Sequence, residues 1–268
     1  MSITVASMKI TVIGAGNMGG ALVKGFIKSG AVSAKDVTVS DVSQANLGRM
    51  KDYNPEICLC SDNVKAVSGA DFVVIAVKPW IAEKVVRQIA DAVSVPVISI
   101  AAGVACGTLR EWLGGKDLAL FRVIPNTAAE FLESMTFVQA DGASADEKAD
   151  VMGLLGSVGA VMEIEEKMFP AATTLSSCGI AYAMKYIRAS MQGGITLGFA
   201  PKVSEDIVLQ TVKGAAKLLQ ESGNHPEAEI DKVTTPGGIT IKGINAMEAN
   251  GFTNAVIEGI LAGGKAGK

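Results

Sequence analysis

Histidine is nearly absent from this chain of 268 residues, in which His225 stands alone. The common zinc sites combine several His and Cys ligands at short spacing, and Cys58, Cys60, Cys106 and Cys178 form no such pattern with it. We therefore expect no metal site. His225 lies in a loop expected between two helices, which also disfavours a histidine proton relay in any catalysis.

Cysteine is scarce as well, with four residues in the whole chain. This number does not suggest the disulfide framework of a secreted protein, so we expect a reduced, cytoplasmic protein. Cys58 and Cys60 alternate in an apolar run, and they are expected to be two buried thiols on opposite faces of a strand rather than a redox pair.

Long charged or apolar runs are also missing. A net charge of −3 without runs of like charge disfavours binding to nucleic acid. The longest uncharged stretch, 92–109, is interrupted by Pro96 and Gly103, and it is expected to be a buried strand followed by a glycine turn rather than a membrane span. The N-terminus lacks the pattern of a signal peptide, and residues 1–7 are expected to be a short extension.

From Lys9 to about residue 165, short β-branched runs alternate with segments of helical period. Strands are expected at 10–13, 37–40, 71–77, 97–100, 118–124, 135–139 and 161–164, and helices at 19–29, 44–50 and 81–92. This order is typical of repeated βαβ units, and the continuous apolar runs favour a mostly parallel sheet with helices on both faces. The pattern predicts an α/β, doubly wound Rossmann domain over residues 1–165.

Beyond residue 165 the strand-like runs stop, and helical segments are expected at 180–197, 202–222, 239–249 and from 254 to the end. We therefore expect an all-helical second domain over residues 166–268. Many of its surfaces are apolar or small, as in 189–200, which predicts that its helices pack against a second copy in a homodimer.

A glycine-rich turn follows the first expected strand and opens the first helix. It reads Gly14-Ala15-Gly16-Asn17-Met18-Gly19, which matches the dinucleotide fingerprint in the position that the fingerprint requires. Such a turn lets the backbone approach a pyrophosphate at a helix N-terminus. The alternative is a glycine-rich turn without a ligand.

Two strand ends supply further candidates for a nucleotide site. Asp41 ends the second strand at the distance typical of a carboxylate that accepts both ribose hydroxyls of NAD, although it could simply cap the following helix. No arginine lies between 37 and 48, which weakly supports NADH over NADPH. Lys78 and Pro79 follow the central strand over 71–77, where Lys78 either binds a ligand or is simply solvated. At the end of another strand, small residues that begin with Ala101 leave room for a flat ring.

The segment Thr234-Thr235-Pro236-Gly237-Gly238-Ile239-Thr240 precedes a helix in the second domain. Its glycines free backbone N–H groups to meet a small carboxylate, and Thr235 and Thr240 add hydroxyls, although an ordinary helix-capping loop would look similar. With the nucleotide site, this segment suggests hydride transfer to a small acid. Because a catalytic histidine is missing, a C=N bond is the more suitable target, since an imine nitrogen protonates far more readily than a carbonyl oxygen.

Five ordered motifs, which together extend over nearly the whole chain from Met8, resemble those of the pyrroline-5-carboxylate reductase family. They are the glycine turn, Ala76-Val77-Lys78-Pro79, Ser99-Ile100-Ala101-Ala102-Gly103-Val104, Arg122-Val123-Ile124-Pro125-Asn126-Thr127, and the Thr-Pro-Gly-Gly-Ile-Thr segment. The resemblance implies reduction of 1-pyrroline-5-carboxylate to L-proline with NAD(P)H, NADPH being usual in the family. It also implies a homodimer or a pentamer of dimers, with the active site between the domains.

The resemblance also assigns roles to individual residues. Thr240 is implied to be the proton donor or orienter at the ring nitrogen, and the loop Thr235, Gly237, Gly238, Ile239 and Thr240 to hold the substrate carboxylate. The residues expected to bind the cofactor are Gly14, Gly16, Asn17, Met18, Gly19, Asp41, Asn63, Val77, Lys78, Pro79, Ala101 and Asn126.

Two stretches depart from the family pattern. Ser177, Cys178 and Ile180 replace family residues in the turn over 176–182, and Ile124 and Ala128 replace the methionine and the last proline of the family's Met-Pro-Asn-Thr-Pro. These departures leave room for a reductase of a related cyclic imine or ketimine acid, or for a non-catalytic NAD(P)-binding protein. A β-hydroxyacid dehydrogenase would need a catalytic lysine, for which Lys185 is the candidate, and would leave the loop over 235–240 unexplained.

Overall fold

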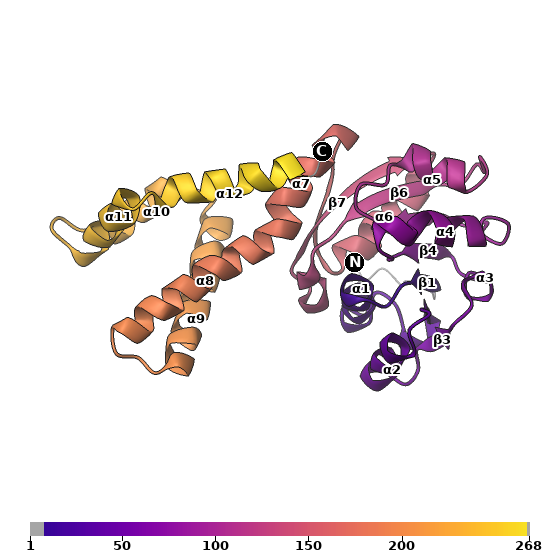
Figure 1. Ribbon diagram of the computed structural model, residues 1–268, viewed down its shortest axis with the longest axis horizontal. Helices are drawn as coiled ribbons and strands as arrows, with labels where there is room; N and C mark the ends of the chain where they lie inside the picture. The colour runs from indigo at the N-terminus through magenta and orange to yellow at the C-terminus, as the bar shows by residue number, and fades with distance from the viewer. Residues whose placement is uncertain (1–7, 267–268) are drawn as a thin grey trace. The chain divides into compact units, whose positions relative to one another are not determined.

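The computed structural model describes residues 8–266, which form two compact units, 8–177 and 178–266 (Figure 1). The extension expected over residues 1–7 lies outside the described residues. The last strand of the first unit ends at Glu163, and short helical turns continue that unit as far as Ser177. The domain limits of 1–165 and 166–268 therefore stay a prediction.

The first unit is built on one sheet of eight strands in the order β3-β2-β1-β4-β5-β6-β7-β8. Its strands are β1 Ile10–Ile13, β2 Val37–Ser40, β3 Cys58–Cys60, β4 Phe72–Ile75, β5 Val97–Ser99, β6 Leu120–Ile124, β7 Ser134–Asp141 and β8 Gly159–Glu163. All neighbouring strands run parallel except β6 and β7. The predicted Rossmann sheet, with β1 and β4 as neighbouring interior strands, is thus confirmed.

Helices cover both faces of this sheet. They are α1 Asn17–Lys28, α2 Gln44–Tyr53, α3 Asn63–Ala66, α4 Pro79–Ile89, α5 Cys106–Trp112, α6 Ala145–Gly156 and α7 Phe169–Ala172, with 3₁₀ turns η1 Ala34–Asp36, η2 Thr127–Phe131 and η3 Glu166–Met168. On one face, buried side chains of α1, α2 and α6 pack with alternate strand residues such as Val12 and Val74. On the other face, α4 and α5 pack with Ile13 and Ile75. This alternation follows from the two-residue period of a strand.

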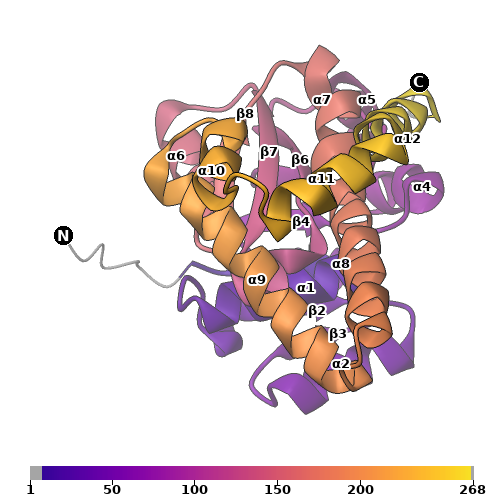
Figure 2. The same cartoon turned by 90° about the vertical axis from the view of Figure 1, so that its left-hand side faces the viewer.

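The second unit is all helical, as predicted. The π-helix Thr173–Cys178 leads into α8 Gly179–Thr196, which α9 Pro201–Ser222, α10 Pro226–Val233, α11 Ile239–Ala249 and α12 Phe252–Ala266 follow. Helices α8 and α9 form a hairpin (Figure 2), and Gly194 comes so close to α9 that a β-carbon there would lie 2.2 Å from Ser204 Oγ. Pro201 begins α9 and Gly223, with φ +63°, ends it, which agrees within one residue with the predicted range of 202–222.

The second unit buries very little of its own surface. Ser204 is the one buried residue among 178–264, whereas large apolar side chains of every helix stay exposed, such as Met184, Ile207, Leu218 and Ile257. None of the helices within residues 8–266 is both long enough and apolar enough to cross a membrane.

The burial predicted for Cys58 and Cys60 is wrong. Cys58 is exposed and Cys60 is half-buried, because β3 is the edge strand of the sheet and has β2 as its neighbour on one side alone. An apolar run at the edge of a sheet is not covered as a central strand is.

The four thiols are expected to differ in reactivity. Burial raises the pKa of Cys106 to about 11, so its thiol stays protonated at pH 8, whereas Cys58 is open to solvent. We expect iodoacetamide to label Cys58 well before Cys106 in the folded protein, as followed by peptide mass spectrometry. Unfolded protein serves as the control, in which both must react at similar rates. Equal labelling of the two thiols in the folded protein would contradict the burial of Cys106.

Candidate active site

The glycine turn joins β1 to α1 through a conformation that only glycine tolerates well. Gly14 has φ +105°, and a β-carbon there would lie 2.5 Å from the carbonyl oxygen of Ala76 on the neighbouring strand end. The Gly14 N–H donates to Ser40 O at 2.7 Å, which fixes the turn against the end of β2. The turn is therefore held between two neighbouring strands.

Gly16 caps α1 without a side chain, so the N–H groups of the first turn find no side-chain acceptor at the cap. A β-carbon on Gly16 would meet no atom within 4 Å, so the space in front of this helix end is open. Unpaired N–H groups and the positive end of the helix dipole suit a phosphate group. Gly19 has a different role, because a β-carbon there would lie 2.0 Å from Gly14 O, and it lets the helix pack against the turn.

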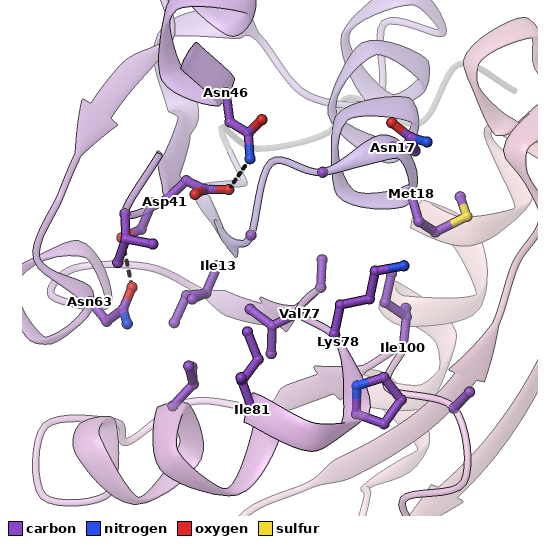
Figure 3. Close-up of a pocket in the computed structure, with 18 of the residues that line it drawn as sticks. Ile13, Asn17, Met18, Asp41, Asn46, Asn63, Val77, Lys78, Ile81 and Ile100 are labelled. Carbon is purple, nitrogen blue, oxygen red and sulfur yellow. Dashed lines mark hydrogen bonds between the residues drawn. The ribbon is translucent and has the colours of Figure 1, made fainter. Parts of the chain in front are cut away.

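A cleft of about 740 Å³ opens where the strands of the sheet end, next to the glycine turn. Asn17 and Met18 lie on one side of it, and Val77, Lys78 and Ile81 lie on the other (Figure 3). Nine of the twelve residues predicted to bind a cofactor line this cleft: Gly14, Gly16, Asn17, Met18, Asp41, Asn63, Val77, Lys78 and Pro79. Its position at the carboxyl ends of parallel strands is where open α/β sheets bind ligands.

The other three predicted residues do not line the cleft. They are Gly19, Ala101 and Asn126, and neighbours of the last two, Ala102 and Thr127, face the cleft instead. Ala101 is buried, and so is Asn126, whose amide accepts from Ala128 N at 3.0 Å and donates to Ser176 Oγ at 3.1 Å. A role for these residues in cofactor binding stays a prediction.

Asp41 both ends β2 and organises the turn after it. Its carboxylate accepts from Ala15 N at 2.7 Å, Ser43 N at 2.8 Å and Asn46 Nδ2 at 2.9 Å, while Ser43, not Asp41, caps α2. The two oxygens of a carboxylate offer about four acceptor positions, so about one stays free for a ligand. In this arrangement Asp41 has room for one ribose hydroxyl, and its binding to both hydroxyls stays a prediction.

Asn63 and Lys78 both line the cleft, from the start of α3 and from the residue before α4. Asn63 accepts from Ser40 Oγ at 2.7 Å and donates to Gln88 Oε1 at 3.0 Å, which ties α3 to β2 and α4. Lys78 precedes Pro79, the first residue of α4, and its Nζ lies 6.0 Å from the ring centre of the exposed Trp80. The Lys78 cation is thus available at the rim of the cleft.

Sequence reasoning missed several residues of the cleft. Val42, Asn46 and Arg49 line it next to Asp41, and Ile81 lines it on α4. Asn46 and Arg49 are three residues apart on α2, a spacing that places them on one face of the helix. That spacing after Asp41 was the signal that could have identified them.

The loop before α11 belongs to the second unit. Thr235 to Gly238 form a tight turn, with a hydrogen bond of 2.9 Å from Gly238 N to Thr235 O and φ +71° at Gly237, as in a type II turn with Pro236 at its second position. Gly238 caps α11 without a side chain, and Thr240 is exposed in the first helical turn. Backbone N–H groups and a hydroxyl thus stand together, which suits a small carboxylate.

His225 lies at the start of a helix, where its ring contacts the backbone. His225 caps α10 through Nδ1, which accepts from Glu227 N at 3.3 Å. Within residues 8–266, no three His, Cys, Asp or Glu side chains lie so that they could hold a metal ion. The cleft and the loop before α11 are thus the two candidate sites for binding and catalysis.

Two family models match the chain. Residues 9–103 match the model described as NADP oxidoreductase, coenzyme F420-dependent, and residues 166–267 match the model described as pyrroline-5-carboxylate reductase dimerisation. The first match contains all the residues that line the cleft except Thr127, and the second contains the loop before α11.

Whole proteins match along the full chain. Pyrroline-5-carboxylate reductase of Arabidopsis thaliana is 32% identical over 99% of this chain and 96% of its own length, and that of Methanosarcina acetivorans is 35% identical over 94% and 95%. The crystal structure of Plasmodium falciparum pyrroline carboxylate reductase with NADP bound superposes with a TM-score of 0.87, at 28% identity and 97% coverage of both chains. The chain therefore belongs to the pyrroline-5-carboxylate reductase family.

Proposed function

We propose that this chain reduces 1-pyrroline-5-carboxylate to L-proline with NAD(P)H. The observation that carries the proposal is family membership along the whole chain, which includes both the glycine turn and the loop before α11. The open space at Gly16 and the uncapped N-terminus of α1 fit the pyrophosphate of a dinucleotide. When bound, NAD(P)H supplies the hydride that adds to the imine carbon.

The chain itself supplies orientation and charge. Asn17, Met18 and Gly16 hold the pyrophosphate, and Lys78 and Pro79 lie at the nicotinamide side. The N–H groups of the loop over Thr235 to Thr240 bind the carboxylate of the imino acid. The Thr240 hydroxyl donates to the ring nitrogen of the neutral imine, or accepts from the N–H of the iminium form, which brings its own proton. Held in this way, the substrate reacts without a catalytic histidine.

We further propose that the active form is a homodimer, or a pentamer of such dimers, in the cytoplasm. Apolar side chains exposed along α8, α9 and α12 are more extensive than a monomer keeps in water, and a second copy would cover them. We expect light scattering of the purified protein to give a mass of at least two chains. A monomer at micromolar concentration would contradict this proposal.

A steady-state assay that follows the nicotinamide absorbance tests the proposed reaction. Pyrroline-5-carboxylate and its six-membered homologue are each offered with NADPH and with NADH. We expect the five-membered ring to give the higher kcat/KM. A preference for the larger ring would indicate a related cyclic imine reductase, in line with Ser177, Cys178 and Ile180. Tight cofactor binding without turnover of either ring would indicate a non-catalytic protein.

A further inference from the structure

Arg49 lies on α2, at the end of the cofactor cleft that contains Asp41. It lies where the main cleft meets a smaller one of about 370 Å³, and it lines both. The other cation of the smaller cleft, Lys24, is paired with Glu130 at 2.9 Å. Among residues 8–266, the Arg49 guanidinium forms no ion pair, and Nη2 donates to the neutral amide oxygen of Asn46. Arg49 thus offers a positive charge that no carboxylate compensates.

Asn46 links this cation to Asp41. Its Nδ2 donates to Asp41 at 2.9 Å while its Oδ1 accepts from Arg49, so that the amide lies between a carboxylate and a guanidinium (Figure 3 shows the Asp41 contact). An acidic residue at the end of β2 marks the place of the adenosine ribose in a Rossmann fold. The guanidinium of Arg49 is therefore next to the place where the 2′ position of that ribose is expected.

Asp41 repels a 2′-phosphate less strongly than an unpaired carboxylate would. Three N–H donors, from Ala15, Ser43 and Asn46, already engage the carboxylate and stabilise its negative charge. The residue after it, Val42, is 86% exposed and carries no charge. The sign of the electrostatic potential near Asp41 thus depends on the positive charge of Arg49.

We propose that Arg49 binds the 2′-phosphate of NADPH and makes NADPH the preferred cofactor of this chain in spite of Asp41. The proposal rests on the proposed function, because it assumes that the cleft takes a nicotinamide dinucleotide. It reverses the weak preference for NADH that Asp41 and the absence of arginine over 37–48 suggested. Arginine suits this role, since its planar group donates several hydrogen bonds to phosphate oxygens.

Binding of two nucleotide fragments tests the proposal without any catalysis. Adenosine 2′,5′-bisphosphate and AMP differ by the 2′-phosphate alone, and isothermal titration calorimetry gives the ratio of their Kd values. We expect the unchanged protein to bind the bisphosphate more tightly and Arg49→Gln to reduce this advantage about 10- to 100-fold. The matched control is Lys51→Gln, which removes a positive charge from the same helix at an exposed residue outside both clefts.

The ratio of kcat/KM for NADPH over NADH provides the second readout. It is expected to fall by a similar factor in Arg49→Gln and to stay unchanged in Lys51→Gln. Equal ratios in Arg49→Gln and the unchanged protein would overturn the proposal, as would equal affinity of the unchanged protein for both fragments. If the imine is not reduced with either cofactor, the proposed function fails, while the fragment titration still decides the role of Arg49.

Discussion

Replacement of Gly16 with alanine is expected to leave the fold intact and to weaken cofactor binding at least about tenfold. The backbone at Gly16, with φ −67° and ψ −168°, suits any residue, and a β-carbon there would touch no protein atom within 4 Å. That β-carbon would instead occupy the space through which the pyrophosphate approaches the N–H groups of α1. Calorimetric titration with NADPH and thermal unfolding of the variant measure the two effects separately.

The neighbouring glycines are the matched controls. A β-carbon at Gly19 would lie 2.0 Å from Gly14 O, and one at Gly14 would lie 2.5 Å from Ala76 O in a backbone of φ +105°. We expect alanine at either position to destabilise the first unit by about 2 kcal/mol or more, since the turn must move. Should Gly16→Ala bind NADPH as the unchanged protein does, the cofactor would not approach the helix at this glycine.

Thr240→Val is expected to lower kcat about 10- to 100-fold, with a much smaller change in the Kd of NADPH. The substitution keeps the branched shape and removes the hydroxyl that is proposed to meet the ring nitrogen. Because Thr240 is exposed in the first turn of α11, loss of its hydroxyl leaves no buried polar group unpaired. Steady-state kinetics with saturating cofactor measure the effect.

The control for Thr240→Val is Thr211→Val on α9, which removes an exposed hydroxyl that donates to Ile207 O at 2.8 Å. This variant should keep the kcat of the unchanged protein. A kcat of Thr240→Val within twofold of the unchanged protein would remove Thr240 from the reaction and leave the backbone of the loop as the substrate contact.

Sequence patterns predicted the centre of the fold better than its edges. The apolar runs of β1 and β4 identify central strands, because such strands are covered on both faces. The same reasoning misplaced Cys58, since an apolar run does not say whether a strand has one neighbour or two. Helix α6 was missed although Ser144 and Glu147 form a capping box at its start, a signal that sequence alone contains.

The candidate site also has features that the sequence predicted and features that it did not. The glycine turn was predictable because a tight turn and an open helix end need particular residues at particular positions. The hydrogen-bond partners of Asp41 were not predictable, because the positions of Ala15 and Asn46 relative to its carboxylate are set only by folding. Asn126 shows the same limit, because its hydrogen bonds to Ala128 of η2 and to Ser176 depend on how these segments meet after folding.

The scarcity of buried residues in the second unit has a kinetic consequence. A chain segment of this length loses a large conformational entropy on folding, which buried apolar surface normally offsets, yet within 178–264 Ser204 alone is buried. In the proposed homodimer, ordering of these helices is therefore coupled to encounter between two chains. Refolding of the second unit should be second order in protein concentration, whereas the sheet of the first unit should form at a rate independent of it.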